Sequence, residues 1–239
     1  MTSSLLLRGL LAGLLAGLLA FGFARVAGEP EVDRAIAFES AVSHAGHDDE
    51  PEIVSRETQR SLGLFTGVLV YSTALGGLFS LVFAASMGRV ARPLGPRGLA
   101  ALLALLGFVA IILVPDLTYP ANPPSVGHPD TIRLRTGLFF LMLLVSAASM
   151  AAAVHLARSL AERWGAWNAV LGGVAAYLLV MLLAHHLFPA IDEVPSGFPA
   201  TLLWQFRITS LGLHMVLWTS LGLLFGWLAE QRLLRGPSW

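Results

Sequence analysis

Histidines and carboxylates gather in one short stretch toward the C-terminal end of the chain. Residues 185–207, HHLFPAIDEVPSGFPATLLWQFR, connect the ends of two long apolar segments. Imidazole and carboxylate groups together suit divalent first-row metals such as cobalt, nickel and zinc. The chain has no cysteine, which excludes thiolate ligands and disulfides. We therefore predict a metal site that includes His185, His186, Asp192 and Glu193.

Two further residues extend this predicted site. Asp116 follows an earlier apolar segment in a position like that of Asp192, and His214 lies about twelve residues into the last segment, near the bilayer midplane. An ionisable side chain at that depth is costly and indicates function. The alternative for His214 is a neutral side chain that hydrogen-bonds between helices.

The two adjacent histidines also have a second interpretation. Neighbouring helical residues point about 100° apart, so His185 and His186 converge on one ion only if the helix ends there. Pro189 favours such an ending. Otherwise both are solvated side chains at the depth of the lipid headgroups.

A second candidate lies in the segment AVSHAGHDDEPE. His44 and His47 precede three consecutive acidic residues, a set that can gather a cation from solution. Acidic loops are also commonly just solvated. His155, near the other end of its apolar segment, is expected to be interfacial, and the alternative is a metal ligand on the exit side.

Composition identifies the elements that must position these residues. The chain is 56% hydrophobic and 13% charged, against about 25% charged in a soluble domain. About six continuously apolar stretches have the length that crosses a hydrocarbon core of about 30 Å. Their lack of alternation excludes a β-barrel. The predicted fold is all-α: a polytopic integral membrane protein with about six transmembrane helices, surrounded by the lipid bilayer.

The predicted single transmembrane domain covers residues 1–239. Its helices are expected at 5–26, 62–87, 99–114, 136–157, 165–188 and 202–229, with an acidic outer loop at 28–60. Gly9, Gly13 and Gly17 recur every four residues in the first helix and predict close approach of another helix. A cleaved signal peptide is the alternative for this first segment.

Arginines indicate the orientation. Short connections on one side are rich in arginine, whereas nearly all acidic residues lie on the other side. Because cytoplasmic loops are enriched in basic residues, both termini are predicted to be cytoplasmic. Arginines on the outer side, including Arg60, Arg135 and Arg207, either pair with Asp116, Asp192 or Glu193 or extend to the headgroups.

Catalytic and nucleotide-binding motifs are not recognisable. The chain contains no Walker-type loop, no HExxH and no flavin fingerprint. A membrane enzyme is therefore disfavoured, an ATP-driven process would need a separate chain, and no nucleic-acid partner is expected.

The Pro-spaced strings carry a family resemblance. PDLTYPANPPSVGHPDTIRLRTGLFF at 115–140 and FPAIDEVPSGFPATLLWQFRITSLGLHMVLWTSLG at 188–222 resemble the CbtA family of predicted cobalt transporter subunits. The start LLLRGLLAGLLAGLLAF and the following GEPEVDRAIAFE agree with it. The resemblance implies a membrane protein linked to cobalamin metabolism, often beside a small one-helix partner, CbtB, with a His-rich end.

The residues and the resemblance together predict uptake of Co²⁺ across the bacterial inner membrane. Cobalt would be the transported substrate, with no cofactor bound permanently, and a homo-oligomer is left open. The alternatives are transport of nickel or another divalent metal, since the ligand types do not separate these ions, and a non-transporting scaffold that captures metal.

Overall fold

The chain is helical throughout the part that is described. The structure is a computed structural model that describes residues 2–43, 55–90 and 94–234, and no strand occurs within these ranges. The α-helices are α1 (Thr2–Phe23), α2 (Glu29–Ser43), α3 (Arg56–Thr58), α4 (Leu64–Ser86), α5 (Pro96–Gly107), α6 (Val114–Thr118), α7 (Ile132–Leu187) and α8 (Ala200–Leu234). The π-helical segments are η1 (Ala24–Gly28), η2 (Gln59–Gly63) and η3 (Phe108–Leu113), and η4 (Pro129–Thr131) is a 3₁₀ turn.

Five helical segments in the described ranges are long and apolar enough to cross a membrane. They are Thr2–Val42, Arg56–Ser86, Pro96–Thr118, Pro129–Leu187 and Ala200–Leu233. The all-helical membrane class predicted from composition is therefore confirmed. Six crossings and cytoplasmic termini remain predictions.

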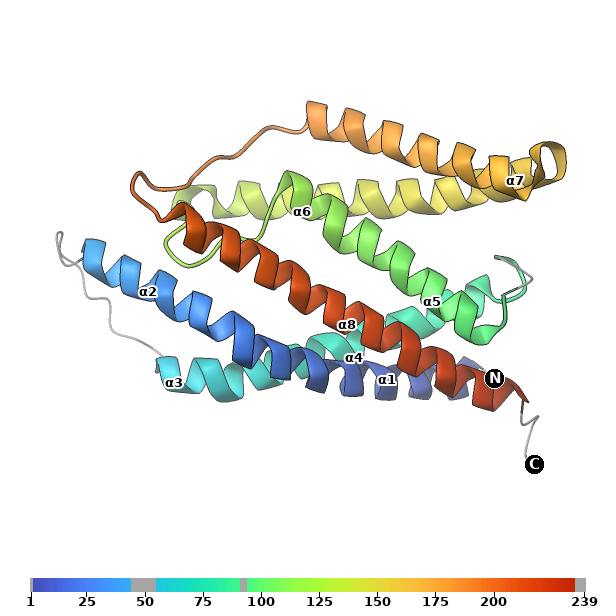
Figure 1. Cartoon of the computed structure of the whole chain (residues 1–239), viewed down its shortest axis with the longest axis horizontal. Coiled ribbons are helices and arrows are strands. Elements are labelled where there is room, and N and C mark those ends of the chain that lie inside the picture. The colour runs from blue at the N-terminus through green and yellow to red at the C-terminus, as the bar shows by residue number, and fades with distance from the viewer. Residues whose placement is uncertain (1, 44–54, 91–93, 235–239) are drawn as a thin grey trace. The chain divides into compact units, whose positions relative to one another are not determined.

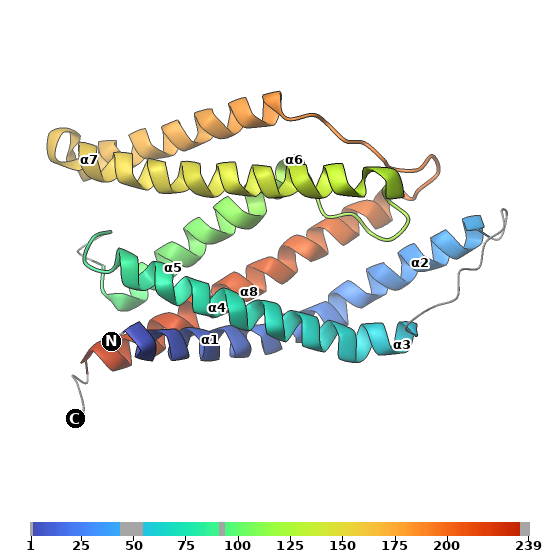
Figure 2. The same cartoon turned by 180° about the vertical axis from the view of Figure 1, so that it is seen from behind.

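Five candidate spans are found where six were predicted, because α7 joins two helices that were expected to be separated by a turn. The backbone stays helical through Arg158 and Arg163 and departs only at Gly165, with φ 76° and ψ 157°. Glycine has no Cβ and adopts this conformation without a steric penalty. The helix doubles back there into two arms, 132–164 and 166–187 (Figures 1 and 2). Each arm is longer than the about 20 residues that a crossing needs.

The chain divides into two compact units. The first contains residues 1–105, 123–125 and 198–239, and the second contains residues 106–122 and 126–197. A single domain over the whole chain therefore stays a prediction, and each unit is described by itself below.

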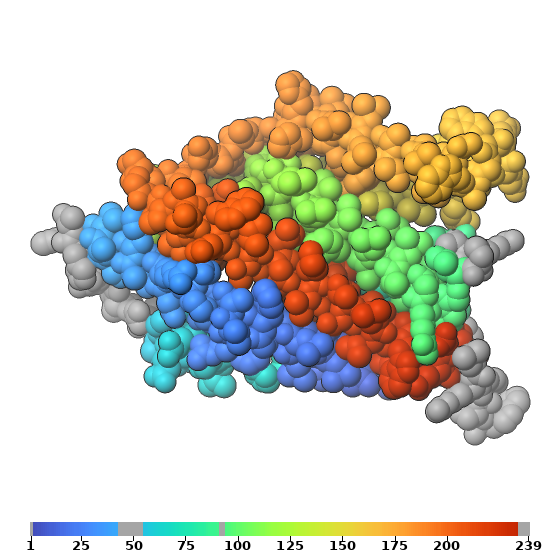
Figure 3. All heavy atoms as spheres, viewed as in Figure 1, coloured from blue at the N-terminus to red at the C-terminus, as the bar shows by residue number. Residues whose placement is uncertain are grey.

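The first unit is built on the glycine stripe of α1. Gly9, Gly13 and Gly17 face Ser72, Gly76 and Ser80 of α4, and the helices are so close that a Cβ at Gly13 would stand 3.0 Å from the Gly76 Cα. This confirms the predicted helix contact. In the space-filling view α8 lies along α1 and α2 (Figure 3). Phe225 of α8 is fully buried against Phe79 and Phe83 of α4, with ring centroids 5.4 and 5.0 Å away.

The predicted acidic loop at 28–60 is partly helical, which corrects the expectation. After the π-helical turn η1, α2 continues to Ser43, and η2 leads directly into α4. Ion pairs stabilise this extension. Arg56 Nη2 lies 2.6 Å from Glu29 and 3.0 Å from Asp33, so α3 is tied to α2. The acidic residues of 29–33 thus belong to a packed helix and are not freely solvated.

The second unit contains η3, α6, η4 and the two arms of α7. Met142 and Met181 lie in its buried core, and the Ser146 and Tyr177 hydroxyl oxygens are 2.9 Å apart between the arms. This hydrogen bond satisfies two polar groups within an apolar interface. The arms are thereby held side by side.

Candidate functional site

Glu193 is the best-anchored residue of the predicted site. Its Oε2 accepts a hydrogen bond from the His128 backbone N–H at 2.8 Å and lies 3.3 Å from Nε of Arg135. Its side chain is 12% exposed. One of the predicted pairings for the outer arginines, Arg135 with Glu193, is therefore confirmed.

Gly127 has no side chain, and the Arg135 guanidinium fills the space beside it. Its φ is +124°, and a Cβ there would stand 2.7 Å from the guanidinium carbon of Arg135. The guanidinium therefore lies directly on the backbone of the 126–131 segment. Together with Glu193 it ties this segment to the connection after α7.

His185 and His186 do not converge. α7 ends at Leu187, close to the predicted boundary at residue 188. The helix ending expected at the histidine pair itself is wrong, because both histidines lie within the helix. His185 Nδ1 is 3.1 Å from the Thr118 hydroxyl of α6, and both histidines are exposed. The helical backbone keeps the two imidazoles on different faces.

The other carboxylates of the predicted site do not gather around one centre. Asp192 is exposed, and its Oδ1 accepts from the Val194 backbone N–H at 3.4 Å. Asp116 lies in the short helix α6 and is half-buried, because the helix predicted to end at residue 114 continues past Pro115. Within residues 2–43, 55–90 and 94–234, no three His, Asp or Glu side chains are gathered closely enough to hold a metal ion.

His214 lies inside the long apolar span of α8, as predicted. Its Nδ1 is buried and has no hydrogen-bond partner among the described residues, and the same holds for the Trp218 indole N–H one turn later. Residues four apart share a helix face. A buried polar atom without a hydrogen-bond partner is uncommon in folded proteins.

His44 and His47 lie outside the described residues, so their tract stays a prediction. His155 is exposed near the middle of α7, in its first arm.

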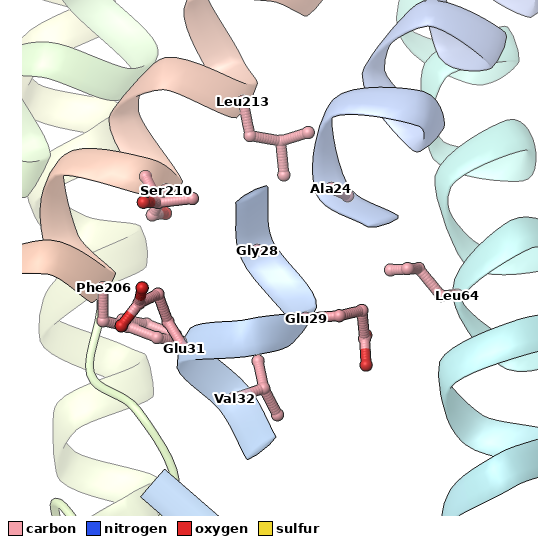
Figure 4. Close-up of a pocket in the computed structure, with 10 residues that line it drawn as sticks. Ala24, Gly28, Glu29, Glu31, Val32, Leu64, Phe206, Ser210 and Leu213 are labelled. Carbon is pink, nitrogen blue, oxygen red and sulfur yellow. The ribbon is translucent and has the colours of Figure 1, made fainter. Parts of the chain in front are cut away.

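A cavity that the sequence prediction did not include lies beside η1. It has a volume of about 150 Å³ and is lined by residues of η1, α2, α4 and α8. Two of them, Glu29 and Glu31, are only 7% and 9% exposed. Figure 4 shows Glu31 on the side of Ser210 and Phe206, and Glu29 on the side of Leu64. The sequence feature that could have indicated this cavity is the acidic string GEPE directly after a long apolar run.

The comparison with protein families covers nearly the whole chain. Residues 2–230 match the family described as "Probable cobalt transporter subunit (CbtA)". The chain belongs to the CbtA family. Comparisons with curated proteins and with solved structures gave no match.

Membership of the CbtA family confirms the resemblance seen at 115–140 and 188–222. With the long apolar helices, it makes this chain a membrane protein of a cobalt transporter family. The family description names a transporter subunit, a kind of protein that works in a complex and is generally not an enzyme.

In this CbtA chain, the contribution of the Glu193 carboxylate to stability is expected to depend on pH. Hydrogen bonding by the Thr131 side chain and the His128 backbone N–H, with Arg135 close by, lowers the pKa of Glu193 below its ordinary value of 4.5. A lowered pKa means that the carboxylate stabilises the folded state above pH 4.5, and that this contribution is lost as the pH falls through the folded-state pKa. Glu193→Gln should therefore lower the thermal unfolding midpoint in detergent by a few degrees at neutral pH, and the difference from wild type should shrink in acid.

Asp192→Asn is the matched control for Glu193→Gln. It removes a neighbouring exposed carboxylate that accepts only a long hydrogen bond, 3.4 Å from the Val194 backbone N–H, within the described residues. We expect its unfolding midpoint to follow wild type at every pH. An equal loss in both variants would mean that the Arg135 pair does not stabilise this connection.

Proposed function

We propose that this chain moves Co²⁺ across the bacterial inner membrane into the cell. The observation that carries the proposal is the family match over residues 2–230. The long apolar helices support it, because they supply the elements that a passage through lipid requires. Co²⁺ is the transported substrate in this proposal.

The proposed route begins at the outer ends of α6 and α7. His185, His186, Asp116, Asp192 and Glu193 place imidazole and carboxylate groups around this region of the second unit. In this proposal they are successive weak contacts for an arriving ion, with Glu193 also holding the connection in place. His44 and His47 would raise the local concentration of cations before that step.

His214 is the proposed ligand within the membrane. A neutral imidazole nitrogen is a suitable ligand for Co²⁺, and the Nδ1 of His214 has no partner among the described side chains. Because this nitrogen makes no hydrogen bond to the described residues, binding a metal ion breaks no such bond. Because His214 lies deep in the apolar span of α8, it is the proposed ligand that an ion would meet after leaving water.

A second candidate function is metal capture for a separate transporting chain. The word "subunit" in the family description favours it, since a subunit works with other chains. A small one-helix protein of the CbtB type is the proposed partner. In this case the chain binds Co²⁺ but does not pass it through the bilayer alone.

Flux into proteoliposomes separates the two functions. The purified chain is reconstituted without any partner, and external Co²⁺ is followed with a metal-sensitive dye inside the vesicles. Accumulation above protein-free vesicles would establish transport by this chain. Co²⁺ binding without accumulation would establish capture, and neither binding nor flux would contradict both functions. Competition by Ni²⁺ tests which ion is preferred.

A further inference from the structure

Two exposed tryptophans mark the tip of α7, where the helix doubles back between its two arms. Trp164 is 54% exposed and Trp167 is 75% exposed. They stand on either side of Gly165, whose positive φ turns the chain (Figures 1 and 2). Tryptophan combines an apolar ring with a polar N–H, and it is enriched at the boundary between lipid tails and headgroups. A tip that exposes two tryptophans is therefore suited to that boundary.

The tip belongs to a tightly packed helical hairpin. Asn168 Nδ2 donates a hydrogen bond to the Trp164 carbonyl oxygen at 3.0 Å, which closes the turn. Behind the turn the two arms touch through small residues. A Cβ at Gly173 would stand 2.8 Å from the Ala153 carbonyl oxygen and 3.0 Å from the Ala157 Cβ. The exposed indoles are therefore carried on a firm support.

Two arginines beside these tryptophans carry positive charges without an ion-pair partner. Arg158 and Arg163 are exposed, and neither forms an ion pair or a side-chain hydrogen bond with any described residue. Glu162, the acidic residue between them, pairs with neither. Arg56 and Arg97, in contrast, are paired with carboxylates. Because a guanidinium can donate two parallel hydrogen bonds to phosphate oxygens, these free groups fit a surface of anionic phosphates.

We propose that the tip of α7 binds the headgroups of anionic phospholipids, with Arg158 and Arg163 on the phosphates and the indoles of Trp164 and Trp167 at the level of the upper acyl chains. Each arm is long enough to cross the hydrocarbon core, so the turn between them would lie at a bilayer surface. Anionic lipids give that surface a negative potential, and each nearby basic residue strengthens the attraction by about fivefold. The inference does not depend on cobalt or on the histidines of the proposed route.

A fluorescent reporter at the tip tests this proposal on the full chain. The sequence contains no cysteine, so Ala166→Cys, between the two tryptophans, can be labelled at that single position. The labelled chain is reconstituted in phosphatidylcholine vesicles. A minor share of the lipid is phosphatidylglycerol or phosphatidylcholine with a spin label on its acyl chain, which quenches the reporter on contact. Spin-labelled phosphatidylglycerol should compete for the tip about fivefold or more better than spin-labelled phosphatidylcholine.

Arg158→Gln combined with Arg163→Gln should remove the preference for phosphatidylglycerol. The matched control is Arg25→Gln combined with Arg133→Gln, which changes the net charge equally. Arg25 lies in η1 and Arg133 at the start of α7, and both are exposed and without an ion pair among the described residues. The control should keep the preference, because the arginines of the tip are intact.

Equal quenching by the two spin-labelled lipids in the chain with all its arginines would overturn the proposal. So would an equal loss of preference in the two double variants, since that would reflect net charge alone. Quenching by iodide in the water, with none by either lipid, would leave the tip free for another chain and would also overturn it. Trp167→Ala should shift quenching from lipid toward iodide, and an unchanged balance would contradict the place given to the indole.

Discussion

Gly76→Leu is expected to prevent normal packing of α1 on α4. A Cβ at residue 76 would stand 2.8 Å from the Gly13 Cα and 2.9 Å from the Gly13 nitrogen, so the obstacle is backbone that cannot rotate away. Extra side-chain volume in a packed interior costs about 1–3 kcal/mol even where neighbouring side chains adjust. In lipid the association of helices depends on such close packing. A loss of about 1.4 kcal/mol changes an equilibrium constant by a factor of ten. The yield of monodisperse protein in detergent should therefore fall by roughly tenfold or more.

Gly67→Leu is the control for this prediction. It lies on the same helix, and a Cβ there has nothing within 4 Å. The two substitutions add the same side chain to the same helix, so general effects of leucine cancel. Comparable yields of the two variants in fluorescence-detected size-exclusion chromatography would show that the α1–α4 contact does not hold the first unit together.

Cobalt accumulation should fall by about tenfold or more when His185, His186 and His214 are all replaced by alanine. Loss of residues around a metal typically lowers affinity by about 10–100-fold. The combined variant removes both helical histidines at the C-terminal end of α7 and the imidazole of α8 whose Nδ1 is buried. The measurement is uptake of Co²⁺ by cells that express equal amounts of each variant in the membrane. Uptake equal to wild type would mean that the proposed route is wrong.

His155→Ala provides the matched control, because it removes an exposed imidazole from α7 away from the proposed route. Trp218→Phe adds a second comparison. It removes the other buried polar atom on the His214 face and cannot remove a metal ligand, since an indole N–H only donates. Reduced uptake in His214→Ala with normal uptake in Trp218→Phe would assign the effect to the imidazole. Equal loss in both would indicate that this face of α8 acts through packing.

Composition and the spacing of apolar residues were sufficient to predict a helical membrane protein and the approximate positions of its helices. The lengths of apolar runs are local properties, and a hydrocarbon core accepts few backbone structures. The spacing of Gly9, Gly13 and Gly17 also predicted a close helix contact, because small residues at this interval expose the backbone on one face. The Pro-rich strings at 115–140 and 188–222 were specific enough to indicate the family that the comparison then established.

The arrangement of the polar residues required the tertiary structure. Whether His185 and His186 converge depends on where α7 ends, and the backbone continues to Leu187 past both of them. Glu193 was expected as a metal ligand or as the partner of an arginine such as Arg135, and only the fold adds the His128 backbone, which approaches it from a distant segment. Glu31 and Gln205 are far apart in sequence, and only the packing of α8 on α2 brings both to the guanidinium of Arg34. Sequence patterns report which side chains a helix carries and on which face. Which of them meet is decided by long-range packing, and that packing leaves His214 with a buried nitrogen that has no partner among the described residues.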